Sequence, residues 1–175
     1  MTRTETRRPG PDDYAPTFAG YVARIGGEDV LDVLTAQHRE LVDRIKGLPE
    51  ARGDHRYEPG KWSIKEVIGH LSDTERVFAY RALRIGRGDS TPLTSFADQA
   101  YVAEMHMASR RLADVASEWG DVRQATLSLF RNLPAVAWDR RGAVGGHSTT
   151  VRALAFVIAG HTRHHLEVLE SRYGA

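Results

Sequence analysis

Hydrophobic residues recur every three to four positions in four long stretches of the chain, which is the spacing of an amphipathic helix. These stretches cover about residues 29–47, 63–88, 112–134 and 150–172. No stretch alternates hydrophobic and polar residues convincingly, as a half-buried strand would. The pattern therefore predicts an all-α fold, a four-helix bundle.

Polar residues at the starts of these stretches have the properties of helix caps. Asp29 precedes the first stretch and Thr149 or Thr150 precedes the fourth, and such side chains accept hydrogen bonds from the free amides of a first helical turn. Ser63 and Glu66 have the spacing of a capping box at the start of the second stretch. The helix starts are therefore specified locally.

Two parts of the chain lack a helical period. Residues 1–27 contain three of the prolines and predict an extended N-terminal arm, frayed or laid across a bundle domain of residues 28–175. Residues 88–109 form a long connection with a possible short helix around residues 98–105. About 20 residues at about 3.3 Å each can return along a helix of about 36 Å, so the third helix can run parallel to the second.

Three of the eight histidines lie within residues 159–169. On a helix, His161 and His165 stand one turn apart on the hydrophobic stripe, where polar groups need partners. His70 lies about 10 Å from the start of the second helix, and His165 lies about as far from the end of the fourth. These depths match in an up-down-down-up bundle with the long crossover between helices two and three.

The three imidazoles of His70, His161 and His165 are then expected to meet inside one end of the bundle. Three protein ligands leave a coordination position for water or substrate, as in a catalytic metal site. The alternative is a set of core histidines that are satisfied by hydrogen bonds, because a His-x-x-x-His pair also arises by chance. The chain contains neither the Glu-x-x-His of ferritin-like sites nor the His-Glu-x-x-His of zincins.

The remaining polar candidates have weaker patterns. His38 is expected to be a hydrogen-bonded boundary residue, and His164 lies on the next face round, where a surface or interhelical hydrogen bond is favoured over a proton shuttle. His147 lies in a polar loop of residues 140–148 and could either overhang the site or be a plain loop residue. His55 and His106 are assigned no role. Glu66 is favoured as a cap over a base, and Asp73 is expected to face solvent.

Composition narrows the function further. The chain of 175 residues has a formal net charge of +1, which gives no basic field for nucleic acid, and no apolar run reaches the length of about 18 that a membrane span needs. No targeting signal is recognised, so a cytoplasmic location is expected. With no cysteine, any metal must be held by His, Asp or Glu, and any thiol must come from outside.

The segments Lys61-Trp62-Ser63 to Arg76 and Gly160-His161-Thr-Arg-His164-His165, with Trp138 before the last loop, resemble the DinB family and most closely its YfiT-like branch of metal-dependent hydrolases. The resemblance covers nearly the whole chain after about the first 20 residues. It implies an up-down-down-up four-helix bundle, often a dimer, with a divalent ion held by His70, His161 and His165. Characterised relatives include thiol S-transferases that use bacillithiol and a mycothiol-dependent maleylpyruvate isomerase.

Two hypotheses of function follow. In the first, a divalent ion (Zn, Ni, Mn or Fe) on the three histidines activates water or a low-molecular-weight thiol against a small-molecule substrate, as a hydrolase or a thiol S-transferase. Residues 90–107 and 140–148 are expected to line the mouth of the site, and metal affinity is expected to fall below pH about 6.5. The alternative is a non-catalytic bundle that binds metal or a small ligand.

Overall fold

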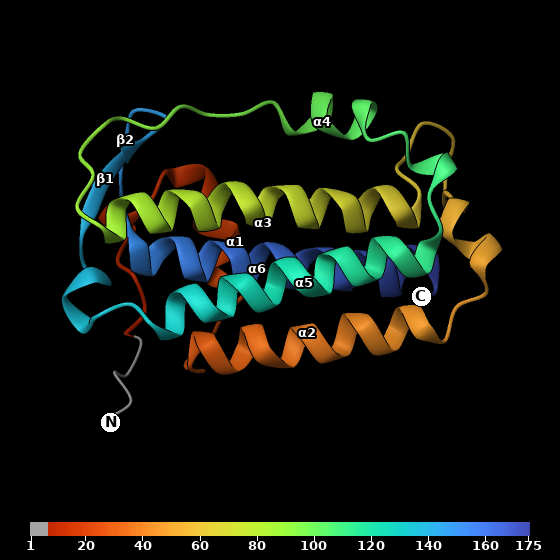
Figure 1. Ribbon diagram of the computed structural model, residues 1–175, viewed down its shortest axis with the longest axis horizontal. Coiled ribbons are helices and arrows are strands. Elements are labelled where there is room, and N and C mark those ends of the chain that lie inside the picture. Colours follow the sequence, from red (N-terminus) through yellow and green to blue (C-terminus); the bar gives the residue numbers. More distant parts are fainter. Residues whose placement is uncertain (1–6) are drawn as a thin grey trace.

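The structure is a computed structural model that describes residues 7–175, and four long helices dominate it. They are α2 (Val30–Lys46), α3 (Ile64–Gly86), α5 (Leu112–Arg131) and α6 (Val151–Val168). Figure 1 shows that α2 and α6 run in one direction along the bundle and α3 and α5 in the other. The predicted up-down-down-up four-helix bundle is therefore confirmed. None of the helices in the described chain is long and apolar enough to cross a bilayer.

Local hydrogen bonds at the helix starts explain why the sequence gives these boundaries. The Asp29 carboxylate accepts from backbone amides of the first turn of α2. Ser63 Oγ accepts from the Glu66 amide at 3.2 Å, and the Ser63 amide donates to Glu66 Oε2 at 2.6 Å, so the predicted capping box is present. The hydroxyl of Thr150, the second of the two threonines considered, caps α6. The last turn of α6 widens into a π-helical segment, Leu169–Tyr173.

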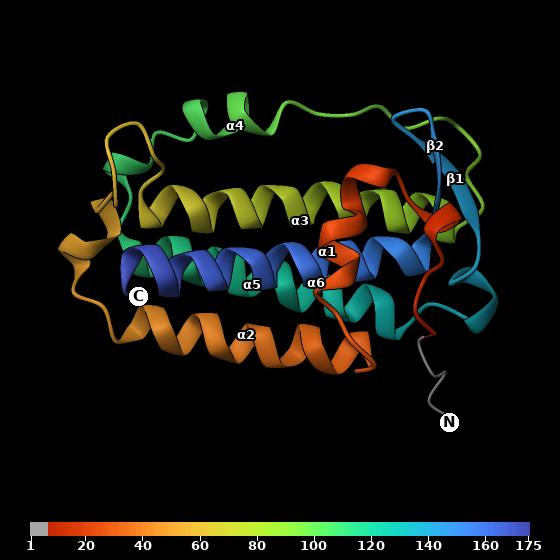
Figure 2. The same ribbon diagram turned by 180° about the vertical axis from the view of Figure 1, so that it is seen from behind.

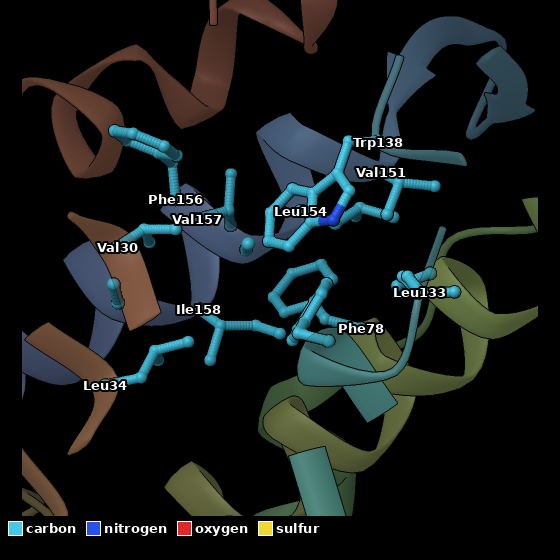
Figure 3. Close-up of a cluster of buried hydrophobic side chains, with 14 of the residues drawn as sticks. Val30, Leu34, Phe78, Leu133, Trp138, Val151, Leu154, Phe156, Val157 and Ile158 are labelled. Atoms are coloured by element: carbon cyan, nitrogen blue, oxygen red, sulfur yellow. The ribbon is translucent and has the colours of Figure 1, made fainter. Parts of the chain in front are cut away.

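The buried hydrophobic side chains form two separate clusters, one in each half of the bundle. The first cluster includes Phe78, Trp138, Leu154 and Ile158, which pack against one another in Figure 3. The second includes Trp119 and lies toward the other end. Each of the four long helices contributes to both clusters, with polar residues in the interval between them.

A buried hydrogen-bonded network of four side chains, which we call the polar layer, fills that interval; its members are Gln37, Glu75, Arg123 and Thr162, one from each long helix. Arg123 is 0% exposed and binds Glu75 in bidentate fashion, at 2.7 Å and 2.6 Å. It also donates to Gln37 Oε1 at 3.2 Å and to Thr162 Oγ1 at 2.9 Å. Such a buried ion pair is tolerated only because its hydrogen-bonding capacity is satisfied.

The chain between α3 and α5 crosses the full length of the bundle along the outside of α3 (Figure 1). This crossover contains α4 (Asp98–Glu104) and a 3-10 turn, Met107–Ser109, so the short helix expected there is confirmed. Because the crossover spans the length of the bundle, α5 begins at the same end as α3 and the two helices run parallel. The crossover packs closely on α3 beside the histidine at position 70, because a Cβ atom on Gly69 would lie 2.2 Å from Met107 Cε.

Within residues 7–175, a small antiparallel hairpin departs from the all-helical expectation. Strands β1 (Arg141–Val144) and β2 (His147–Thr150) pair where a polar loop was predicted. Gly145 and Gly146 have φ values of 55° and 82°, which suit the two-residue turns that close hairpins and which other residues rarely adopt. Leu93 of the crossover pairs with Val144, so the hairpin also fastens the start of the crossover. Strands this short and this exposed leave too little alternation to predict.

The described part of the N-terminal arm lies across α6, as Figure 2 shows from behind. It is not extended throughout, because it contains two 3-10 turns (Pro11–Asp13 and Pro16–Phe18) and the short helix α1 (Ala19–Ala23). Residues 1–6 of the predicted arm lie outside the described residues. The arm sits against the backbone of α6, since a Cβ atom on Gly160 would lie 2.0 Å from the Tyr21 carbonyl oxygen.

Gly69 and Gly160, the two helical glycines that lie under close contacts, give a matched stability prediction. Gly160→Ala is expected to lower the free energy of unfolding by about 2 kcal/mol, because the new methyl group meets rigid backbone and overpacking outweighs the gain of about 1 kcal/mol in helix propensity. Gly69→Ala is expected to change it by less than about 1 kcal/mol, because the methionine side chains opposite can rotate away. Urea unfolding measures both, and tryptic cleavage after Arg24 reports release of the arm. Equal stability of the two variants would contradict the tight seat of the arm on α6.

Candidate metal centre

The structure brings together the three histidines that the sequence predicts as metal ligands. His70 comes from α3, and His161 and His165 come from α6. The Nε2 atom of His161 lies 3.0 Å from that of His70 and 3.1 Å from that of His165. The residues are 4%, 6% and 9% exposed for His70, His161 and His165. His70 on α3 therefore lies at the same depth in the bundle as His161 and His165 on the antiparallel helix α6, as predicted.

Hydrogen bonds within this histidine cluster cannot satisfy all of its nitrogens. The Nε2 atom of a neutral imidazole carries either one proton or one lone pair, so His161 Nε2 can serve only one of its two neighbours well. Nitrogens bound at about 2.0–2.1 Å to a tetrahedral zinc ion lie about 3.3–3.4 Å apart, close to the 3.0 Å and 3.1 Å that separate His161 Nε2 from the other two Nε2 atoms. The donor set therefore fits a divalent ion.

Burial lowers the pKa of each imidazole in the cluster. The pKa of His161 lies well below its usual range because of burial first and its histidine neighbours second. Burial, assisted by the proximity of His70 and His164, lowers the pKa of His165 to about 3, and burial also lowers that of His70. The rings are therefore neutral at physiological pH, as metal ligation requires. Because protons compete only below these lowered pKa values, the predicted loss of metal affinity moves from pH about 6.5 to lower pH.

The lowered pKa of His165 gives a pH prediction for the metal-free protein. An unfolded histidine has a pKa of about 6.5, so the unfolded chain binds more protons than the folded chain between pH 6.5 and about 3. Titration of His165 therefore leaves the free energy of unfolding unchanged above pH 6.5. Below pH 6.5 it lowers that free energy by about 1.4 kcal/mol for each unit by which the pH is lowered. We expect urea unfolding at pH 7, 6 and 5 to show a shallower decline for His165→Gln than for the unmodified chain. Parallel curves would contradict the assignment.

Neighbouring side chains hold the rings in place. Trp62 lies with its ring centroid 4.7 Å from that of His70 and stacks over His165 at 6.4 Å. The hydroxyl of Tyr173 donates to the Trp62 carbonyl at 2.6 Å and fixes that loop. Thr74 Oγ1 lies 3.5 Å from His70 Nδ1, whereas His165 Nδ1 has no hydrogen-bond partner among residues 7–175. The orientation of His165 therefore depends on packing. Sequence reasoning named Trp62 only within a family motif and did not single out Thr74.

The other histidines take separate positions. His164 is half-buried and its ring lies 6.0 Å from that of Tyr21, outside the group of potential ligands identified within the described residues. His38 is half-buried, with Nδ1 3.2 Å from Gln124 Nε2, as expected for a boundary residue. His147 is exposed at the start of β2 and lines a cavity beside the cluster, in agreement with the overhang alternative.

The two acidic candidates behave as expected. Glu66 closes the capping box and also forms an ion pair with Arg56 at 2.6 Å, so it is a cap rather than a free base. Asp73 forms a partly exposed ion pair with Arg76 at 3.2 Å.

The cluster lies between two cavities. The first, which we call the arm cavity, has a volume of about 460 Å³ and is lined by His70 and His161 together with Tyr21, Phe96, Asp98 and His147. The second, of about 520 Å³, is lined by His165, Trp62 and Tyr173 among others. The crossover and the 140–148 segment therefore line the mouth as predicted, but the contribution of the N-terminal arm was not foreseen. Both cavities therefore border the histidine cluster.

Comparisons with known proteins agree with this architecture. The family model of the DinB superfamily matches residues 33–169. The solved structure of YfiT from Bacillus subtilis is similar, with a TM-score of 0.73 and 16% identity over 93% of this chain and 94% of that one. YfiT is described as a probable metal-dependent hydrolase with an unusual four-helix bundle topology. At this identity the likeness shows the fold alone. No curated protein matches the sequence.

Proposed function

We propose, because this chain belongs to the DinB superfamily, that it is a metal-dependent enzyme whose ligands are His70, His161 and His165. The single observation that carries the proposal is the meeting of these neutral, buried Nε2 atoms at the wall of two cavities. A divalent ion there would lower the pKa of bound water or of an incoming thiol. The description of YfiT as a probable metal-dependent hydrolase supports the same reading.

The chain's own residues prepare this chemistry by position and by burial. The Trp62 ring packs against those of His70 and His165, and the Tyr21 ring of the arm lies 5.2 Å from that of His161. This packing limits the access of bulk water to the rings, which strengthens electrostatic interactions inside the site. Lowered pKa values keep the imidazoles unprotonated. The polar layer begins at Thr162, directly beside His161, and anchors α6 where it carries its ligands. The site is therefore preorganised by the fold.

Two reaction types fit the site, namely hydrolysis and transfer of a free thiol. The chain contains no cysteine, so a thiol would arrive as a separate low-molecular-weight molecule. We expect purified protein loaded in turn with Zn, Ni, Mn and Fe to retain one equivalent of at least one metal. Loaded protein is then incubated with p-nitrophenyl acetate and with 1-chloro-2,4-dinitrobenzene, each with and without cellular thiols. Release of nitrophenol without thiol indicates hydrolysis, and thiol-dependent conjugation indicates transfer.

The control is His70→Ala, which should abolish whichever reaction is seen. An unchanged reaction rate in His70→Ala would reject metal activation at the cluster. If no metal is retained under any loading condition, the alternative of a non-catalytic bundle that binds a small ligand is favoured. The homodimer and the cytoplasmic location stay predictions, to be measured by light scattering and by cell fractionation.

A further inference from the structure

Arg81 on α3 is a buried cation that has no acidic partner among residues 7–175. It is 4% exposed, and within the described part of the chain its one hydrogen bond to another residue runs from Nη2 to the Thr94 carbonyl at 2.7 Å. The guanidinium lies between two aromatic rings, 5.2 Å from the centroid of Phe78 and 5.4 Å from that of Phe96. Burial lowers its pKa, with no carboxylate acting in the opposite direction. A guanidinium has five donors, so most of its hydrogen-bonding capacity is free.

The other buried cations in the described chain show that this is unusual for the molecule. Arg123 pairs with Glu75, and each of the others also has a carboxylate within 3 Å: Lys65 with Asp54 and Arg152 with Asp139. Burying a charge is costly unless it is paired. Arg81 therefore retains an uncompensated positive charge that a ligand can neutralise.

The position of Arg81 connects it to the histidine cluster. It lines the arm cavity together with His70 and His161. Arg81 lies eleven positions after His70, which is about 16 Å along α3 and within about 20° of the same face. Helical side chains lean toward the N-terminus, so the guanidinium leans toward the cluster. Phe18, Phe78 and Phe96 also line the cavity and give it apolar walls.

We propose, building on the function proposed above, that the arm cavity binds an elongated organic carboxylate, with its anionic end on Arg81 and its reactive end at the histidine cluster. A single negative charge is favoured because Arg81 is the one lysine or arginine among the lining residues, and Asp98 lines the same cavity. A planar guanidinium can bind a carboxylate in bidentate fashion. A body with aromatic or aliphatic carbons matches the phenylalanine walls. The sequence reading assigned Arg81 no role.

The test is calorimetric titration of metal-free protein with 4-phenylbutyrate, 4-phenyl-1-butanol and phenyl phosphate. The carboxylate is expected to bind at least about 10-fold more tightly than the neutral alcohol, because only the anion forms charge-assisted hydrogen bonds with the guanidinium. A similar factor is expected over the dianionic phosphate, because Arg81 neutralises one negative charge and Asp98 lies in the same lining. Arg81→Met should weaken carboxylate binding by about 10- to 100-fold, and Arg81→Lys should weaken it less. The matched control is Arg84→Met, which removes an arginine of α3 that pairs with Asp89 away from the cavity.

Folding of each variant is checked by urea unfolding. Arg81→Met is expected to be as stable as the unmodified chain, because it removes an unpaired buried charge. A large loss of stability would show that Arg81 is structural and would overturn the proposal, as would equal binding by Arg81→Met, equal binding of the alcohol, or no binding of the carboxylate. Because the titration uses metal-free protein, carboxylate binding is measured independently of metal binding. Carboxylate binding without metal uptake would reject the metal function alone, and the reverse would reject the carboxylate site alone.

Discussion

Arg123→Met is expected to lower the free energy of unfolding by about 3–5 kcal/mol, because it leaves the Glu75 carboxylate buried without its counter-charge. The side chains of Arg123 and Glu75 are 0% and 2% exposed, so water cannot replace the lost partner. Gln37 and Thr162 lose a donor at the same time. In a domain of this size the loss corresponds to a fall in melting temperature of roughly 6–20 °C.

Calorimetry and urea unfolding measure the effect, and Arg76→Met is the matched control. Arg76 follows Glu75 on the same helix, but its ion pairs with Asp73 and Glu118 are partly exposed, so its loss should change stability by less than about 1 kcal/mol. The double variant Glu75→Met with Arg123→Met is expected to recover much of the loss, because no unpaired charge remains. A single Arg123→Met variant that unfolds like the control would contradict the described network.

The second large effect is expected at the metal centre, where His161→Ala should weaken metal binding by more than about 100-fold. His161 is the central member of the cluster, with its Nε2 within 3.1 Å of both other Nε2 atoms. Loss of a supporting residue around a metal ligand typically costs 10- to 100-fold, so loss of a ligand should cost more. Two imidazoles from different helices would remain, too few for the proposed site.

His164→Ala is the matched control, because it removes the neighbouring histidine of α6 that lies outside the cluster. Competition titration with a chromogenic chelator gives the affinities. Differential scanning calorimetry adds an independent readout, since metal at 100 times its dissociation constant stabilises the folded state by about 2.7 kcal/mol. This stabilisation should be retained in His164→Ala and absent in His161→Ala. Equal affinities of the two variants would rule out the proposed ligand set.

The sequence predicts the bundle and the cluster well because both depend on distances measured along helices. Hydrophobic periodicity locates the long helices, and the side chains of Ser63 and Thr150 mark two of their starts. The depths of His70 and His165 from their helix ends depend only on the rise per residue. A crossover long enough to return along α3 then leaves few topologies open. These predictions needed no knowledge of side-chain contacts.

Other features could not be predicted because they depend on how the elements face one another. Arg123 and Glu75 are charged residues in amphipathic helices, which a pattern assigns to solvent unless the partner helix is known. Gly160 is an ordinary helical glycine until Tyr21 is placed against it. The hairpin rests on two positive φ values in a segment otherwise rich in polar residues. Arg81 likewise has meaning only once the arm and the crossover enclose a cavity around it.

The polar layer also restricts how the helices can slide past one another. A one-turn slip of α5 against α3 shifts one helix by about 5.4 Å relative to the other. Hydrophobic faces would still meet in both halves of the bundle, so apolar packing alone discriminates weakly between such registers. The same slip would separate Arg123 from Glu75 and leave two buried charges unpaired. Glu75 lies on α3 with His70, and Thr162 is next to His161 on α6. Because Arg123 binds both Glu75 and Thr162, the polar layer sets the register of α3 against α6. The spacing of the imidazole nitrogens therefore depends on the hydrogen bonds of Arg123, although Arg123 makes no hydrogen bond to the three histidines.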